Sequence, residues 1–259
     1  MATFPDNSPS LQAPAAGRKP TAARLRKEQN ILETAELHFA QYGFEGASLD
    51  LIAQDAGLSR HNLLYYFASK EELYLRVLGD VLAQWLAGMS DLLRGDDPAA
   101  ALRTYIRAKL QSSQDRPHGS KVFTREVMAG APRFGDAIRD QVGPVLAADV
   151  QAFERWVAQG KIARVDFTHL MFILWSVTQA YADQQAQFAL LLGQPALTPQ
   201  DYDQAAELIY RLVVRGLQPE GSVAAPMPAP QPSTTTSTWP AAPCDSPSAP
   251  VGRRKSAKK

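Results

Sequence analysis

Two short helical segments joined by a tight turn, in the first quarter of the chain, restrict the fold more than any other feature of the sequence. The first segment follows Ser48 and stops at Gly57, a residue suited to the left-handed backbone conformation that ends many helices. The second segment follows Ser59, so a serine precedes each segment where it can cap the helix N-terminus. Within the second segment, Leu63 and Phe67 lie one turn apart and are predicted to be buried. Two short helices joined so closely predict a helix-turn-helix.

The outer side of the second short helix carries side chains suited to contact with DNA. Arg60, His61, Asn62 and Tyr66 are predicted to face outward. Polar donors and acceptors at the N-terminal end of such a helix can read base edges in a major groove. The net charge of +1 does not decide for or against nucleic acid, but cations cluster just before the first long helix. A solvated helix start explains this cluster equally well. Its members are Arg18, Lys19, Arg24, Arg26 and Lys27.

The chain between its two ends is predicted to be helical throughout. No segment shows the sustained apolar and polar alternation of a half-buried strand, so the predicted fold class is all-α. Ser69 and Glu72 form a capping box that begins a longer helix after the helix-turn-helix. We predict nine helices, which are the two short ones, the second over residues 60–67, and seven more over residues 24–42, 69–93, 98–115, 121–129, 144–159, 166–192 and 199–217.

Composition limits the location and the chemistry of the protein. No apolar run approaches the roughly 18 uncharged residues that a membrane span needs, and the N-terminus lacks the pattern of a secretory signal. We therefore expect a cytoplasmic protein with no membrane partner. Cys244 is the only cysteine, which excludes an internal disulfide and a cysteine-rich zinc site. The four histidines fall into no metal-binding spacing and accompany no nucleophile motif, so we expect no enzyme activity, no cofactor and no metal.

The segment from Gly57 to Leu73, GLSRHNLLYYFASKEEL, resembles the signature of the TetR family of transcriptional regulators, with Phe44 and the segment SLDLIA at 48–53 in register. In that family the third helix reads the major groove and the start of the fourth holds the phosphate backbone. The resemblance implies an N-terminal three-helix DNA-binding domain, followed by a helical domain that binds a ligand and dimerises. By this likeness the domains would cover residues 23–68 and 69–218. The composition of the two ends, rich in Pro, Ala, Ser and Thr, predicts a disordered arm at 1–22 and a disordered tail at 219–259 with a basic end.

The same resemblance assigns the DNA contacts residue by residue. Base contact is implied for Arg60, His61, Asn62 and Leu64, and phosphate contact for Ser48, Ser59, Tyr66 and Lys70. Leu64 departs from the tyrosine frequent at its position, so contact with a thymine methyl group would replace a phosphate bond there. Each assignment has a simpler alternative, because the serines are also needed as helix caps and His61 can be merely exposed.

The likeness continues to about residue 218 and points to a pyrimidine-utilisation regulator within the family. It implies uracil or thymine as the effector, in a pocket that includes Trp85, Trp175 and Gln179. A primary amide can donate to and accept from one edge of a pyrimidine, and a tryptophan one helical turn earlier can cover the ring. Membership of an ordinary core is the alternative for these three residues. The sequence departs from that regulator at Thr124, where a cysteine is expected, and at Ala180, where a histidine is expected, so the pocket differs in polarity.

Recognition of DNA by such a reader predicts a homodimer. Two recognition helices in successive major grooves lie about 34 Å apart, which requires a near-palindromic double-stranded operator. The last two predicted helices carry the apolar residues expected at a four-helix interface, which are Leu170, Leu174, Tyr181, Leu208, Ile209, Leu212 and Val213. The helix that begins at Ser69 joins Lys70 to Trp85, and this predicts a repressor released from its operator by the pyrimidine. A regulator that senses a lipophilic ligand and a nonspecific architectural DNA-binding protein remain as alternatives.

Overall fold

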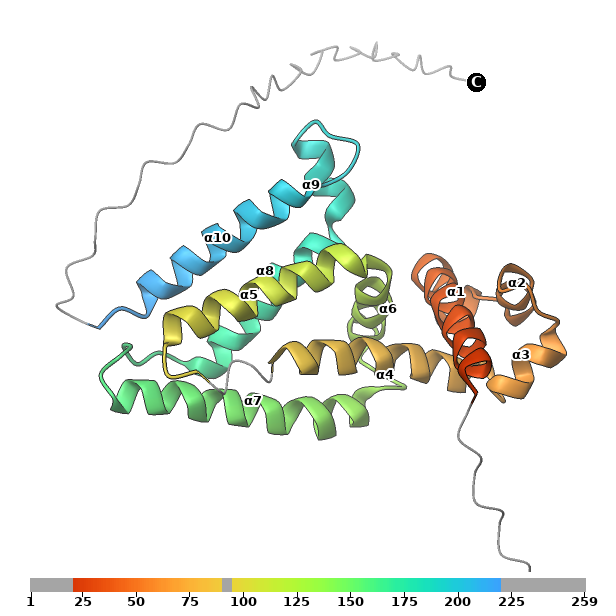
Figure 1. The fold of residues 1–259 in the computed structure, drawn as a ribbon, viewed down its shortest axis with the longest axis horizontal. Coiled ribbons are helices and arrows are strands. Elements are labelled where there is room, and N and C mark those ends of the chain that lie inside the picture. The colour runs from red at the N-terminus through yellow and green to blue at the C-terminus, as the bar shows by residue number, and fades with distance from the viewer. Residues whose placement is uncertain (1–20, 90–94, 220–259) are drawn as a thin grey trace, which may run out of the picture.

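The computed structural model describes residues 21–89 and 95–219, and within these it contains ten helices and no strand, which confirms the predicted all-α class (Figure 1). The helices are α1 (Ala22–Gly46), α2 (Leu49–Asp55), α3 (Arg60–Tyr66), α4 (Lys70–Met89), α5 (Pro98–Asp115), α6 (Pro117–Met128), α7 (Gly135–Ala158), α8 (Phe167–Asp183), α9 (Gln185–Leu191) and α10 (Pro199–Gly216). The proposed disordered arm and tail, with Arg18, Lys19 and Cys244, fall almost entirely outside the described residues.

The helix-turn-helix forms at one end of the molecule from α2 and α3, which pack against α1 (Figure 1). Gly57 has φ 70°, and the amide of Leu58 donates to the carbonyl of Ala53 at 2.8 Å, which closes the C-terminus of α2 as the sequence indicates. Ser59 caps α3, because its hydroxyl accepts from the amide of Asn62 at 3.2 Å. Ser48 stands at the N-cap position of α2 but makes no side-chain cap bond, so the prediction that it caps the helix is wrong.

A first core is shared by the helix-turn-helix, formed by α2 and α3 and called the reader below, and by helices from the rest of the protein. Leu63 and Phe67 of the reader pack in one cluster with Leu78 of α4 and Phe123 of α6. Together α1, α2 and α3 form too small a unit to bury enough apolar surface alone, so α4 and α6 complete their core. The reader therefore shares its core with α4 and α6.

A second core lies among α5, α7, α8 and α10. Phe153 and Phe167 stack at 4.8 Å between ring centroids, and Trp156 is fully buried beside them. This core forms the part of the molecule away from the reader (Figure 1). None of the described helices combines the length and the apolar character that crossing a membrane requires.

Several predicted helix boundaries are wrong, and packing explains them. The helix predicted over 144–159 begins at Gly135 instead, with Pro144 inside it. Ile138 packs against the first core and Leu146 against the second, so contacts on both sides of Pro144 compensate for the hydrogen bond that proline cannot make. The helix predicted over 166–192 is divided between α8 and α9, and the helix predicted over 121–129 begins at Pro117.

Candidate functional site

The first turn of α3 presents three polar side chains to solvent, as the sequence predicts. Arg60, His61 and Asn62 are exposed, whereas Leu64 is half-buried. The guanidinium of Arg60 pairs with the carboxylate of Asp50 at 2.7 Å, and both side chains are more than half exposed, at 56% and 63%. Such an exposed ion pair contributes little to stability. Arg60 is therefore held near α2 but can exchange this partner for DNA at small cost.

Two tyrosines at the end of α3 and an arginine at the start of α1 lie together. Only Tyr66 of these three is assigned to the DNA contacts from the sequence. Tyr65 and Tyr66 meet edge to face at 5.6 Å, and the guanidinium of Arg24 lies 5.4 Å and 5.7 Å from their ring centroids. Tyr66 is half-buried against the first core, whereas Tyr65 is 70% exposed. The start of α1 thus lies beside the end of α3. The signal for this contact is the cationic cluster before the first helix, but spacing alone does not place it against α3.

Lys70 has a structural role that sequence analysis does not reveal. Its ammonium donates to the carbonyls of Glu45 and Ala47 at 3.2 Å and 3.0 Å, and it lies 4.8 Å from the ring centroid of Phe44. A cation at the last carbonyls of a helix is favourable because these groups carry partial negative charge. An ammonium has three donors, so Lys70 retains one for a phosphate.

Ser48 and Ser59, which precede the two helices of the reader, also have hydroxyl protons available for a hydrogen bond. The hydroxyl of Ser48 has no hydrogen-bond partner in the described part of the chain, and that of Ser59 accepts a cap bond while its own proton stays free. Both hydroxyls can therefore donate to a phosphate without loss of a helix cap.

A cavity of about 770 Å³ lies between α4, α5, α6, α7 and α8. Its volume falls within the range typical of small-molecule sites. Trp85, Trp175 and Gln179 all line it, so the structure brings together the three residues predicted for the pocket. The other lining residues are Leu82, Leu86, Lys109, Phe123, Thr124, Val127, Met128, Gly130, Ala131, Gly135, Ile138, Val142, Phe172, Ser176, Ala180, Asp183 and Gln184.

One wall of the cavity holds a relay of hydrogen bonds. The amide nitrogen of Gln179 donates to the hydroxyl of Thr124 at 2.6 Å. The Thr124 hydroxyl in turn donates to one carboxylate oxygen of Asp183 at 2.6 Å, and Ser120 donates to the other at 2.8 Å. Sequence analysis notes Thr124 only as a departure and does not find Asp183, because the relay joins α6 to α8 across more than fifty residues.

Lys109 is the cationic group of the cavity. It is buried, its ammonium lies 4.3 Å from the ring centroid of Trp85, and no described residue forms an ion pair or hydrogen bond with it. Burial lowers the pKa of Lys109 to about 8. The indole nitrogen of Trp175 is already used, since it donates to the hydroxyl of Tyr105 at 2.7 Å. Lys109 is therefore a free donor for a ligand, and the sequence offered no signal for it beyond its position on the apolar face of a helix.

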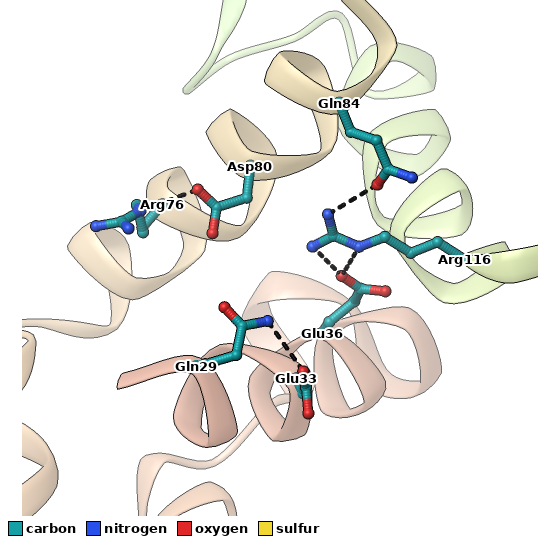
Figure 2. Close-up of polar contacts among 7 residues, drawn as sticks. All are labelled: Gln29, Glu33, Glu36, Arg76, Asp80, Gln84 and Arg116. Atoms are coloured by element: carbon teal, nitrogen blue, oxygen red, sulfur yellow. Dashed lines mark hydrogen bonds and ion pairs between the residues drawn. The ribbon is translucent and has the colours of Figure 1, made fainter. Parts of the chain in front are cut away.

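Arg116 connects α1 and α4 through its hydrogen bonds (Figure 2). Its guanidinium, just before α6, donates to one oxygen of Glu36 on α1 through two nitrogens at 2.7 Å and 2.5 Å. A third nitrogen donates to the amide oxygen of Gln84 on α4 at 3.3 Å. Since α6 lines the cavity with Phe123 and Thr124 and also packs in the first core, both α4 and α6 connect the cavity to the core of the reader. The sequence predicted only the first of these.

Exposed apolar side chains on α8 and α10 differ in part from the predicted dimer face. Leu208 and Leu212 of α10 are exposed, as predicted. Leu174 is fully buried in the second core, so its placement at an interface is wrong, and the exposed apolar residues of that helix are Phe172, Ile173 and Val177 instead. Leu170, Tyr181, Ile209 and Val213 are partly buried against the same core.

Two family models together cover residues 31–220. The model described as "Bacterial regulatory proteins, tetR family" matches residues 31–77, and that described as "YcdC-like protein, C-terminal region" matches residues 78–220, more than half of the chain. The chain belongs to the TetR family. It is therefore a DNA-binding transcriptional regulator and not an enzyme, as the sequence predicted. TetR regulators bind DNA operators and small-molecule effectors and usually dimerise.

Individual relatives agree with this assignment. The HTH-type transcriptional regulator RutR of Escherichia coli (strain K12) is 38% identical over 205 residues, which cover 78% of this chain and 97% of RutR. The TetR-family regulator PfmR from Thermus thermophilus has a TM-score of 0.61 and 22% identity, over 77% of this chain and 98% of PfmR. The ketosteroid regulator KstR2 of Mycobacterium tuberculosis has a TM-score of 0.62 and 21% identity, over 75% and 96%. At such identities the two structures support the fold alone.

Proposed function

We propose that this TetR regulator is a homodimeric, cytoplasmic repressor that leaves its operator when a pyrimidine such as uracil or thymine occupies the cavity. The observation that carries the proposal is that Trp85, Trp175, Gln179 and Lys109 line one cavity. The similarity to RutR covers 97% of that protein. The comparison therefore includes the helical part that contains the cavity as well as the helix-turn-helix, and this supports the proposal.

The cavity has the groups that a flat, polar ring requires. The indoles of Trp85 and Trp175 offer aromatic surface for the ring, which supplies the apolar part of the affinity. Gln179 offers an amide to the ring edge, and Lys109 offers a donor to a ring carbonyl. The ammonium of Lys109 has no hydrogen-bond partner among the described residues, and a ring carbonyl in the cavity would supply one.

On the DNA side, the proposal retains the contacts implied by the family signature. The exposed turn of α3 would read bases, and hydroxyls and cations around it would hold phosphates. The base-reading residues are Arg60, His61, Asn62 and Leu64, and the phosphate-binding residues are Ser48, Ser59, Tyr66 and Lys70.

Ligand and DNA would compete through a shift between two conformations. A ligand that favours one position of α4 and α6 moves elements that share a core with α3, and so changes the distance between the two recognition helices of the dimer. Coupling of roughly 1 to 3 kcal/mol changes operator affinity about 5- to 150-fold. The exposed apolar residues Ile173, Val177, Leu208 and Leu212 support a dimer built on α8 and α10.

The proposal is tested by titration of uracil and thymine into the protein bound to a labelled operator selected from random DNA. We expect either pyrimidine to release the DNA, and Gln179→Leu to require at least tenfold more ligand while DNA binding without ligand is unchanged. Gln187→Leu, on the exposed surface of α9, is the matched control. Absence of release by both pyrimidines at millimolar concentration contradicts the proposal.

A lipophilic effector is the second candidate, because the cavity is mostly lined by apolar side chains and its volume of about 770 Å³ exceeds that of a single pyrimidine ring. A thermal-shift screen that compares pyrimidines with lipophilic cations and acyl thioesters separates the two. A preference for the lipophilic compounds would replace the pyrimidine proposal. Nonspecific DNA binding, the third alternative, predicts no operator preference in a competition assay.

A further inference from the structure

The relay in the cavity wall determines which end of the Gln179 amide is available to a ligand. A carboxylate can only accept hydrogen bonds, and each hydroxyl has a single proton. Asp183 receives bonds from Thr124 and Ser120, so the proton of Thr124 points to Asp183. The oxygen of Thr124 must then accept in its contact with Gln179, and the atom of Gln179 at 2.6 Å must be the amide nitrogen.

The amide oxygen of Gln179 is left as a fixed acceptor. It has no hydrogen-bond partner among the residues the structure describes, and Gln179 lines the cavity. The oxygen and nitrogen ends of an amide are nearly equal in size. Without Thr124 the amide group of Gln179 can therefore rotate by about 180° at little cost and present its nitrogen to the cavity instead. The cavity also contains a fixed donor, since the ammonium of Lys109 can donate but not accept.

We propose that Asp183, acting through Thr124, positions Gln179 as an acceptor and thereby makes the cavity selective for rings that present an N–H beside a carbonyl. The inference rests on the proposed function and deepens it, because it assigns the feature of the ligand that is recognised. Uracil and thymine have such an edge. 1,3-Dimethyluracil has the same ring and the same two carbonyls, but methyl groups replace both N–H groups. It therefore has no donor for Gln179, and a carbonyl placed there sets lone pair against lone pair.

Uracil and 1,3-dimethyluracil are therefore the probes of this positioning, and their dissociation constants are measured by calorimetry. We expect the wild-type protein to bind uracil at least tenfold more tightly than 1,3-dimethyluracil, since one buried polar group left unpaired costs about that much or more. Thr124→Val keeps the size of the side chain and removes the hydroxyl, and we expect it to reduce this preference at least threefold. Thr124→Ser keeps the hydroxyl and should restore the preference.

Two further variants separate positioning from general damage. Asp183→Asn can donate to Thr124 and so reverse the relay, and we expect it also to reduce the preference for uracil. Thr104→Val is the matched control, because the Thr104 hydroxyl bonds only the carbonyl of Ala100 in its own helix and lies outside the cavity. Melting temperature and operator affinity without ligand are recorded for every variant to show that each one folds.

The outcomes distinguish this inference from the proposed function. If the wild-type protein binds uracil and Thr124→Val weakens both ligands equally, the positioning role is refuted while the pyrimidine function stands, and exclusion of the methyl groups by shape alone would give this result. If the wild-type protein binds uracil and 1,3-dimethyluracil equally, the selectivity is refuted. If it binds neither ligand at millimolar concentration, both proposals are refuted.

Discussion

The ion pair between Glu36 and Arg116 offers a direct test of how the cavity is connected to the reader. It joins α1 to the start of α6, and its arginine also contacts Gln84 of α4 (Figure 2). We consider Glu36→Gln, Arg116→Gln and the double variant, because glutamine keeps much of each side chain and removes its charge. The three variants form a double-mutant cycle that isolates the interaction from the separate effect of each substitution.

The burial of the pair sets the expected magnitude. Exposed pairs contribute roughly 0.2 to 1 kcal/mol, whereas removal of one partner from a fully buried pair costs about 3 to 5 kcal/mol. The side chain of Glu36 is 9% exposed and that of Arg116 is 28% exposed, so this pair lies between those limits. We expect each single variant to lower the free energy of unfolding by about 1 to 3 kcal/mol. The coupling in the cycle should be about 1 to 2 kcal/mol.

Urea unfolding followed by circular dichroism measures the cycle, and operator binding with and without uracil measures the connection. We expect the ratio of operator affinities without and with ligand to fall at least threefold in Glu36→Gln. Arg139 and Asp136 provide a control pair on α7, whose side chains are 75% and 89% exposed, and its cycle should give less than about 0.5 kcal/mol. A coupling below about 0.5 kcal/mol for Glu36 and Arg116, or an unchanged affinity ratio, would refute the reasoning.

Three further predictions concern stability, DNA and assembly. Burial without a hydrogen-bond partner among the described residues raises the pKa of Asp149 from 3.8 to about 7, so the folded state holds this proton more tightly than the unfolded state. The free energy of unfolding should therefore fall as pH rises from about 4 to 7, by at most about 4 kcal/mol, and Asp149→Asn should remove most of that fall in urea titrations across this range. Lys70→Met should cost about 1 kcal/mol of stability and lower the salt slope of operator binding by about one; an unchanged slope would make Lys70 purely structural. Leu212→Glu should convert the proposed dimer to monomers in sedimentation and weaken operator binding, and a variant that remains dimeric would contradict the proposed interface.

The helix-turn-helix was predictable because its determinants are local. Ser59 caps the helix that follows it, and Gly57 adopts the left-handed conformation, at φ 70°, that its position requires. Residues three and four apart share a helix face, so the sequence alone assigned Leu63 to the apolar face of its helix. Leu63 is buried in the structure. The same rule placed Trp175 and Gln179 side by side on one helix, and both line the cavity.

Helix boundaries were less predictable because long-range packing decides them. Pro144 is a helix terminator by local rules, yet α7 continues through it since the two halves of α7 bury their apolar sides against different cores. In α8, helical spacing alone allowed Leu174 to face a partner subunit. The fold instead turns Leu174 into the second core and leaves Ile173 exposed.

The sequence by itself therefore determined the fold class and the reader, which follow from short-range spacing and caps, and the family, which follows from the resemblance of residues 57–73 to the family signature. Only the tertiary structure showed the relay from Gln179 through Thr124 to Asp183 and the link from Arg116 to Glu36. Thr124 and Asp183 are 59 residues apart, and Arg116 and Glu36 are 80 apart. No local pattern encodes a contact between such distant residues, because it forms only when the packing of α1, α4, α6 and α8 brings them within hydrogen-bond distance.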